Sequence, residues 1–263
     1  MQDTHIVITG ASSGIGAAAA LISARSGTRL SLLARTRTAL EGVAAQACAL
    51  GAQATAYPVD LTDAAAVAAT ATALLAAAGP PDIFLSNAGS GRWLTSDETT
   101  PAEVVSLMAM PYFAAFYLTR ALLPAMLQRN SGRLVYVNSP AALVAWPGAT
   151  GYTAARWALR GFAEALRADL HGTRVCVSTV ILGQVSSGYY AHNPGVAERI
   201  PGLARLLLPP ITPHHAAAAI LRGIQRGDEL ILAPPMLHAL YLLNALAPGL
   251  IRWLTRTTGW RRK

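Results

Sequence analysis

IVITGASSGIG, residues 6–16, combines an apolar strand-like run, a glycine-rich turn and the start of an alanine-rich segment. The turn carries three glycines in a GxxxGxG pattern and two hydroxyl side chains: Gly10, Gly14, Gly16, Ser12 and Ser13. Glycine lets a backbone turn tightly and approach a pyrophosphate, whose charge the N-terminus of the following helix stabilises. Glycine turns also serve packing alone, but this one lies at the first strand of an alternating chain. It therefore predicts a dinucleotide-binding site.

Outward from this turn, short apolar runs alternate with alanine-rich segments. The runs predict seven strands: HIVITG (5–10), TRLSLLA (28–34), ATAYPVD (54–60), DIFLSNAG (82–89), GRLVYVNS (132–139), TRVCVSTVIL (173–182) and ELILA (229–233). Helices are expected over 16–26, 38–50, 64–78, 101–128 as a pair, 153–171 and 213–226. This alternation indicates a Rossmann-like doubly wound α/β fold, with a parallel sheet and helices on both faces. We expect one dinucleotide-binding and catalytic domain over residues 1–263, because no linker or repeat divides the chain.

Composition supports a single large core. The 263 residues are 53% hydrophobic and 13% charged, which is too apolar for a disordered protein. Cys48 and Cys176 lie far apart, so neither a disulfide framework nor a metal site is expected. A reducing compartment, the cytoplasm, is the default location, and the polar start MQDTH predicts no signal peptide.

The formal charge of +8 is unevenly distributed. The last twelve residues carry five cations and no acid: Arg252, Arg256, Arg261, Arg262 and Lys263. The rest of the chain is therefore only about +3, which argues against nucleic-acid binding. Lys263 is also the only lysine in the chain.

The second predicted strand ends in a way that selects between cofactors. A fold that binds NAD places a carboxylate here, on the ribose 2′-hydroxyl. The chain has Ala34 at that point, followed by Arg35 and Arg37. A guanidinium binds a 2′-phosphate through paired charge-assisted bonds, whereas a carboxylate repels it. NADP(H) is the expected cofactor, and the alternative is that both arginines are solvated loop residues.

Several motifs occur in register over roughly the first 190 residues: TGASSGIG at 9–16, Asp60–Leu61, NAG at 87–89, Ser139 and Tyr152. In these motifs the chain resembles the short-chain dehydrogenase/reductase family, including the thirteen-residue spacing from Ser139 to Tyr152. The resemblance implies a homodimer or homotetramer. It also implies these cofactor-binding residues: Gly10, Ser12, Ser13, Gly14, Ile15, Gly16, Arg35, Asp60, Leu61, Asn87, Ala88, Gly89, Tyr152, Arg156, Gly183, Val185 and Ser187.

The same resemblance assigns roles at the reaction centre. Tyr152 would be the acid/base, Ser139 would hold the substrate oxygen, and the cation at position 156 would bind ribose hydroxyls and lower the pKa of Tyr152. Tyr152 and Arg156 are one helical turn apart, so both can face one site. The alternative is an ordinary pair on a helix surface.

Three positions depart from the family pattern. Arg156 stands where the family has lysine, Pro111 where it usually has a relay asparagine, and Leu182–Gly183 replaces a Pro-Gly pair. Arginine stays protonated in proteins and proline has no side-chain amide, so we hypothesise a modified proton pathway. The alternative for Arg156 is this chain's general use of arginine in place of lysine.

Residues 186–211 form a long connection that contains four prolines and predicts a substrate-covering loop. It offers apolar side chains to a substrate: Tyr189, Tyr190, Ile200, Leu203 and Leu206 to Leu208. They favour an apolar or aromatic carbonyl compound. His192 is more readily explained as solvated, and the adjacent His214 and His215 do not suggest a metal site.

The extension over residues 234–263 is apolar and then basic. The run 233–251 is marginal as a transmembrane helix, because His238, Asn244 and Pro248–Gly249 interrupt it. With Trp253, Trp260 and the terminal cations it suits an interfacial helix on an anionic membrane. A helix buried on the body or at a subunit interface is an equal alternative.

Together these features predict an NADP(H)-dependent oxidoreductase. Its substrate would be a hydrophobic or aromatic ketone or aldehyde, or the corresponding alcohol, with an imine as a further option. The alternative is an NADP(H)-binding regulatory or scaffold protein of the same fold with vestigial catalysis.

Overall fold

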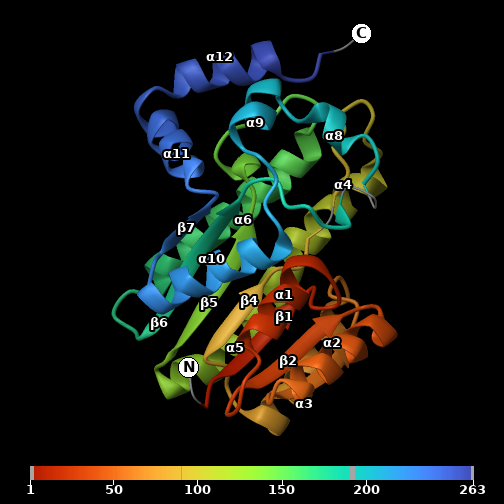
Figure 1. Cartoon of the computed structure of the whole chain (residues 1–263), viewed down its shortest axis with the longest axis vertical. Helices are drawn as coiled ribbons and strands as arrows, with labels where there is room; N and C mark the ends of the chain where they lie inside the picture. The colour runs from red at the N-terminus through yellow and green to blue at the C-terminus, as the bar shows by residue number, and fades with distance from the viewer. Residues whose placement is uncertain (1–2, 90, 190–192, 262–263) are drawn as a thin grey trace.

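The computed structural model describes residues 3–89, 91–189 and 193–261. Seven parallel strands form one sheet in the order β3-β2-β1-β4-β5-β6-β7 (Figure 1). Their bounds are β1 (His5–Thr9), β2 (Arg29–Ala34), β3 (Gln53–Pro58), β4 (Ile83–Ser86), β5 (Gly132–Asn138), β6 (Val175–Leu182) and β7 (Leu230–Ala233). The predicted Rossmann-like fold is confirmed.

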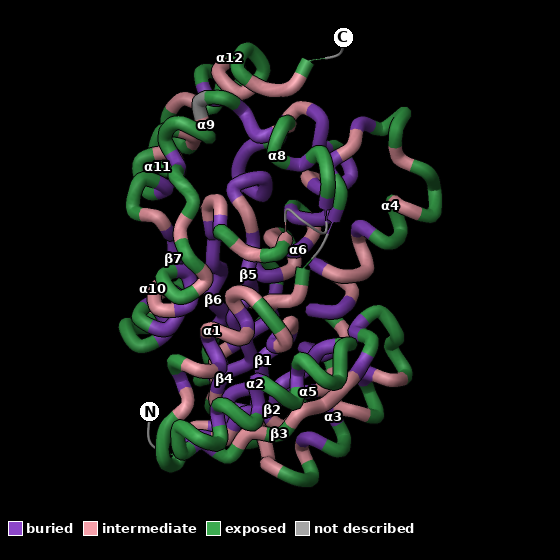
Figure 2. Tube along the Cα trace, turned by 45° about the vertical axis from the view of Figure 1, so that its right-hand side comes forward, coloured by how far each residue is buried: buried purple, intermediate pink, exposed green. Residues whose placement is uncertain are grey.

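Helices cover both faces of the sheet, and their main bounds are α1 (Gly14–Ser23), α2 (Arg37–Ala49), α3 (Ala64–Ala78), α4 (Pro101–Met108), α5 (Ala114–Arg129), α6 (Thr150–Asp169) and α10 (Pro213–Arg226). On one face, α1, α2 and α10 pack against side chains such as Ile6 and Ile8 of β1. On the other face, α3, α5 and α6 pack around Val7 and Phe84. The strands therefore lie in a core that is buried on both sides, as Figure 2 shows.

The strand order reverses between β1 and β4. From β1 the chain proceeds to β2 and β3, and then returns so that β4 pairs with the other edge of β1. In doubly wound sheets the helices diverge at this point and leave a crevice at the carboxyl ends of the strands. The glycine turn after β1 and the NAG segment after β4 meet there.

The helices at 101–128 and 153–171 differ from expectation at functional positions. A π-helical turn, Ala109–Phe113, separates α4 from α5 and contains the buried Pro111. Proline has no N–H to donate, so the wider turn removes the need for that bond. Helix α6 begins at Thr150 rather than at residue 153, which places Tyr152 inside its first turn.

The connection 186–211 is not structureless. It contains two short helices, α8 (Val196–Arg199) and α9 (Gly202–Leu207). Its ends lie side by side, because Val185 bridges Ile211 and the Ser186 amide donates to the Ile211 carbonyl at 2.9 Å. The connection is therefore a closed surface loop with its own helices.

The C-terminal extension forms two helices, α11 (Met236–Leu246) and α12 (Pro248–Thr258). Each has 11 residues and so measures about 16 Å, well short of the ~30 Å hydrocarbon core. Residues 233–251, marginal as a transmembrane helix by sequence, thus contain no helix long enough to cross a bilayer. Among the described residues, one helical run, Pro101–Arg129, is long and apolar enough to cross a bilayer by length and composition. Its α5 part packs Leu118 and Leu122 into the core.

Candidate active site

A cavity of about 490 Å³ lies at the carboxyl ends of the strands. It brings together most of the predicted site residues: Gly10, Ser12, Ser13, Gly14, Ile15, Arg35, Leu61, Asn87, Ala88, Gly89, Ser139, Tyr152, Arg156, Gly183, Val185 and Ser187. Gly16 and Asp60 do not line it. Residues that sequence reasoning missed also line it: Thr36, Trp93, Met110, Asn138, Trp146, Gln184 and Asn193.

The glycine turn has the backbone that a phosphate cradle requires. Gly10 and Gly14 adopt φ of 65° and 56°, in the left-handed region that favours glycine. Gly16 lies behind them, where an added Cβ would overlap the Gly10 carbonyl oxygen. The N-cap residue Ser13 makes no side-chain cap to α1, so the helix N-terminus faces the cavity without a capping side chain.

Thr9, to which the sequence analysis gave no role of its own, connects the end of β1 to the segment after β4. Its buried hydroxyl accepts the amides of Asn87 at 2.9 Å and Ala88 at 3.0 Å. The Asn87 side-chain amide donates to the Thr9 carbonyl at 3.1 Å. The NAG segment is therefore held against the end of β1.

Asp60 bonds to a residue of its own turn and does not line the cavity. Its exposed carboxylate accepts the amide of Thr62 at 2.9 Å and the Thr62 hydroxyl at 2.8 Å. These bonds lower its pKa. Asp60 thus shapes the turn that precedes α3, and Leu61 rather than Asp60 reaches the cavity.

The end of β2 presents Ala34, Arg35 and Thr36 to the cavity. No Asp or Glu is among the described residues that line it. Arg37 points elsewhere and pairs with Glu41 at 3.4 Å. Arg37 is therefore an exposed residue in the first turn of α2, whereas Arg35 lies where a 2′-phosphate could bind.

Tyr152 and Arg156 are not a surface pair, because they are 5% and 7% exposed. The Arg156 guanidinium carbon lies 4.9 Å from the centre of the Tyr152 ring. Its Nη1 donates to the Val137 carbonyl at 3.4 Å, and its Nε is buried without a partner among the described residues. An added Cβ at Gly89 would lie only 2.9 Å from Arg156 Nη2. The Arg156 guanidinium, which is wider than a lysine ammonium group, therefore fits because position 89 is glycine.

Asn138 aligns the segment that carries Ser139. Its side-chain oxygen accepts the Ser139 amide at 2.9 Å, and its amide donates to the Arg156 carbonyl at 3.0 Å. The Ser139 hydroxyl accepts the Ala141 amide at 3.3 Å. These bonds tie the end of β5 to helix α6.

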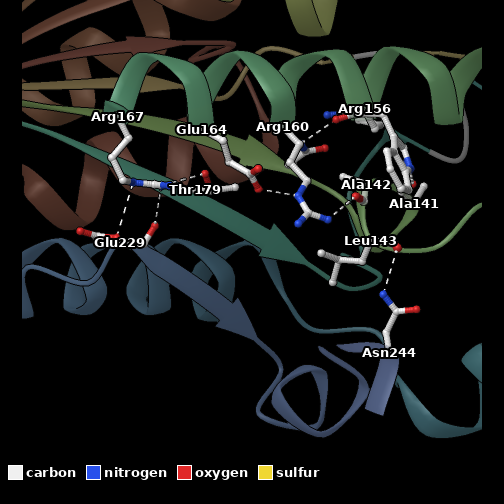
Figure 3. A network of polar contacts seen from close by, with 12 residues as sticks. Ala141, Ala142, Leu143, Arg156, Arg160, Glu164, Arg167, Thr179, Glu229 and Asn244 are labelled. Atoms are coloured by element: carbon white, nitrogen blue, oxygen red, sulfur yellow. Dashed lines mark hydrogen bonds and ion pairs between the residues drawn. The ribbon is translucent and has the colours of Figure 1, made fainter. Parts of the chain in front are cut away.

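Figure 3 shows how the segment after Ser139 is held from two sides. From α6, Trp157 donates to the Ala141 carbonyl at 2.8 Å and Arg160 to the Ala142 carbonyl at 3.1 Å. From α11, Asn244 donates to the Leu143 carbonyl at 3.3 Å. The C-terminal extension thus braces the segment between Ser139 and Trp146, two residues that line the cavity.

An aromatic group borders Tyr152. The Trp93 ring lies 5.2 Å from the Tyr152 ring and 5.1 Å from the Trp146 ring, measured between centroids. The Trp93 indole N–H donates to the Tyr189 hydroxyl at 3.3 Å, and that hydroxyl donates to the Gly91 carbonyl at 2.8 Å. Burial, and then the negative charge that Tyr152 can carry, raises the pKa of Tyr189.

The loop contributes fewer apolar side chains to the cavity than expected. Tyr189 lines it, but Ile200 and Leu208 are buried against other core residues, and Leu206 and Leu207 are exposed. Tyr190, His192 and the Leu203 side chain lie outside the described residues. The expected apolar wall exists, but distant loops supply it through Trp93 and Trp146.

Two further predictions concern metals and the relay. Among the described residues, no three His, Cys, Asp or Glu side chains gather as a metal site would require. Pro111 does not line the cavity, whereas its neighbour Met110 does.

The chain is similar in sequence to several known proteins. The short chain dehydrogenase family model matches residues 4–193. A dehydrogenase/reductase SDR family protein 7-like of Drosophila melanogaster is 30% identical over 257 residues, or 95% of this chain and 78% of that protein. The probable oxidoreductase EphD of Mycobacterium tuberculosis is 30% identical over 97% of this chain, which spans 45% of EphD.

Two solved structures are also similar. A short-chain dehydrogenase/reductase from Burkholderia phymatum in complex with NAD has a TM-score of 0.82 and 26% identity, over 95% of this chain and 96% of its own. A short-chain dehydrogenase from Sphingobium yanoikuyae in complex with NADPH has a TM-score of 0.81 and 25% identity, over 94% and 95%. The chain therefore belongs to the short-chain dehydrogenase/reductase family, a family of oxidoreductases whose fold binds nicotinamide cofactors.

Proposed function

We propose that this protein is an NADP(H)-dependent oxidoreductase that interconverts an apolar or aromatic ketone or aldehyde and the corresponding alcohol, with an imine as a further substrate type. The observation that carries the proposal is the meeting of Ser139, Tyr152 and Arg156 in one cavity with the glycine turn. The left-handed glycines, the α1 N-terminus without a capping side chain and the unpartnered Arg156 Nε fit a bound dinucleotide.

When bound, the nicotinamide supplies or accepts the hydride. Tyr152 donates a proton from its hydroxyl to the substrate oxygen, or accepts one in the reverse direction. Ser139 donates a hydrogen bond to the same oxygen, and the Asn138 contacts hold it in position. Arg156 supplies positive charge beside the Tyr152 ring, which stabilises the phenolate that remains after proton transfer.

The substrate class follows from the wall around Tyr152. Trp93, Met110, Trp146 and Tyr189 line the cavity, and no carboxylate does so among the described residues. The indole N–H of Trp93 is engaged by Tyr189. Such a wall favours an apolar or aromatic substrate, because it offers area for burial and few hydrogen bonds for a sugar.

Turnover separates an enzyme from an NADP(H)-binding scaffold. We expect NADPH consumption with apolar ketones, and a loss of about 10²–10⁴-fold in kcat for Tyr152→Phe with NADPH affinity retained. Tyr112→Phe is the matched control, because Tyr112 does not line the cavity. NADPH binding without turnover of any ketone, aldehyde or alcohol would instead favour the scaffold.

Cofactor preference is tested at the end of β2. Arg35→Asp should weaken NADPH binding by at least about tenfold and leave NADH binding nearly unchanged, because the new carboxylate repels a 2′-phosphate. Arg37→Asp is the control, since Arg37 pairs with Glu41 outside the cavity. Equal losses of NADPH and NADH affinity in Arg35→Asp would contradict the proposed preference.

We also propose a cytoplasmic homodimer or homotetramer, as is typical of the family. Cys48 and Cys176 are free and exposed, which fits a reducing compartment. Apolar side chains on α4 to α6 are exposed, among them Val105, Phe116 and Trp157. Phe116→Glu should therefore lower the mass measured by light scattering, and an unchanged mass would exclude this face as the interface.

A further inference from the structure

Helix α11 is almost entirely apolar, yet most of its residues are exposed to solvent. Ten of its eleven residues are apolar or histidine, yet only Leu237 is fully buried. Leu242 is 58% exposed and Leu246 is 76% exposed. A helix that is apolar on all sides normally lies inside a protein or against another apolar phase.

Helix α12 follows α11 after Ala247 and exposes apolar side chains of its own. It buries Ile251 and packs Leu254 on the body, while Leu250 is 47% and Trp253 is 57% exposed. In Figure 1, α12 lies across the end of the molecule and α11 descends from it; in Figure 2, exposed positions run along both helices. We call Leu242, Leu246, Leu250 and Trp253, with Arg252 and Arg256, the C-terminal surface.

The two arginines of the C-terminal surface lie together on one edge of helix α12. At 100° per residue, Arg252 and Arg256 lie on one edge of the exposed face of α12, and Leu250 and Trp253 lie on the other. Residues 230–263 contain no acid. Glu229 is engaged by Arg167 at 3.6 Å, and the nearest acid on the adjoining loop helices is the exposed Glu198 of α8.

The two tryptophans of the extension have different roles. Trp260 lies under the Arg199 guanidinium, 4.7 Å from its carbon, and beside Gly148. Arg199 in turn pairs with Glu98 at 2.7 Å and lowers the Glu98 pKa to about 2. Trp260 thus fastens the end of α12 to the body, and Trp253 remains available to an external partner.

We propose that the C-terminal surface binds the face of an anionic membrane, with Leu242, Leu246, Leu250 and Trp253 entering the headgroup boundary. Exposed leucines and a tryptophan beside arginines match an interfacial helix, because the apolar side chains leave water while the guanidinium groups reach lipid phosphates. A second copy of the chain fits less well. A two-fold contact through this surface would bring four arginines, two from each subunit, into one interface, and residues 230–263 supply no acid to pair with them.

Membrane contact would lie beside the cavity. Asn244 of α11 holds the Leu143 carbonyl, and Trp260 touches Gly148, so the extension packs on the segment that contributes Trp146 to the cavity. If the proposed substrate class is correct, apolar substrates dissolved in the lipid would be delivered next to this wall. Lipid binding itself does not depend on that function.

The test is co-sedimentation of the full chain with vesicles of phosphatidylcholine alone or with phosphatidylglycerol added. We expect binding to the anionic vesicles that weakens as salt is raised. Arg252→Gln/Arg256→Gln should lower partitioning about 30-fold, at about 1 kcal/mol for each arginine. Leu246→Glu/Trp253→Glu should abolish it. Circular dichroism checks that each variant is folded.

Two controls match these changes at distant exposed sites: Leu50→Glu at the end of α2 and Arg25→Gln after α1. Both should bind as the wild type does. The proposal is overturned if wild type ignores anionic vesicles, or if the C-terminal variants bind as well as the controls. It is also overturned if Leu246→Glu/Trp253→Glu leaves lipid binding intact and lowers the mass in light scattering, since the surface would then join subunits.

Discussion

The two ends of the cavity are built differently. At the cofactor end, one stretch of eleven residues provides a strand, three glycines and a helix N-terminus, so backbone atoms of neighbouring residues make the site. At the substrate end, Trp93, Trp146, Tyr152 and Tyr189 come from four segments and meet only through side chains. A site made by a local backbone turn leaves a contiguous motif. A site made by distant side chains leaves none.

The largest expected effect on unfolding free energy lies at the cofactor end. Gly16→Ala would drive a methyl group into the Gly10 carbonyl and distort the cradle, so we expect a loss of about 1–3 kcal/mol in unfolding free energy and weaker NADPH binding. Gly42→Ala is the control, because nothing lies within 4 Å of its added Cβ. Denaturant unfolding and NADPH titration measure both effects. Equal behaviour of the two variants would show that the turn tolerates a side chain.

The next prediction concerns the proton pathway that Arg156 and Pro111 are expected to alter. Lysine can release and regain a proton, whereas arginine stays charged, so Arg156→Lys/Pro111→Asn should raise kcat above neutral pH about tenfold, or ~1.4 kcal/mol. Profiles of kcat against pH for wild type and variant measure this. Arg120→Lys, an exposed change on α5, is the control. Superimposable profiles would refute the hypothesis of an altered proton pathway.

A smaller effect is expected at the substrate end. Tyr189→Phe removes the bond to the Gly91 carbonyl and the acceptor of the Trp93 indole, which together should cost about 1 kcal/mol in substrate binding. KM should rise several-fold with NADPH affinity unchanged. The exposed Tyr241→Phe is the control. A change in NADPH affinity without a change in KM would assign Tyr189 to the cofactor end instead.

The smallest effect is at the amino end of β1, away from both ends of the cavity. His5 is fully buried between the Ser31 hydroxyl at 2.9 Å and the Gly79 carbonyl at 3.1 Å. Burial, and then the charge of Arg29, lower its pKa from 6.5, while nearby Asp82 opposes this. The unfolded chain therefore binds the proton more readily. Stability contributed by neutral His5 is complete above pH 6.5 and is lost as pH falls towards the folded pKa.

Unfolding free energy should accordingly fall by about 1 kcal/mol or less between pH 7.5 and 5.5. His5→Gln should flatten this dependence, and the exposed His171→Gln should retain it. An unchanged slope in His5→Gln would locate the titrating group elsewhere.

Most of the fold could be predicted from the sequence. All seven strands and the main helices follow from apolar runs and alanine-rich segments, since these periodicities reflect burial on both faces of a sheet. Helix ends were less predictable, because a π-helical turn at Pro111 separates α4 from α5 and α6 begins before Tyr152. The short helices α8 and α9 were missed, since four to six residues carry too little pattern.

The candidate site divides in the same way. Ser139, Tyr152 and the glycine turn could be located by their motifs, whereas Asp60 was placed in the cavity although its carboxylate instead bonds to Thr62. Asn138 carries no motif, and Thr9 begins the TGASSGIG motif without a role of its own in it, because both act by bonding to residues far along the chain. Leu206 and Leu207 were assigned to the cavity by their apolarity alone, and they are exposed.

The sequence by itself determined what local backbone and periodicity encode: the parallel α/β fold, the glycine turn, and the order of Ser139, Tyr152 and Arg156. Only the tertiary structure decided that Arg156 is buried beside Gly89, that Trp93 and Trp146 flank Tyr152, and that the extension bends into two helices with an unburied apolar face. The reason is physical. Local conformation depends on neighbours in the chain, whereas burial depends on which distant surfaces meet.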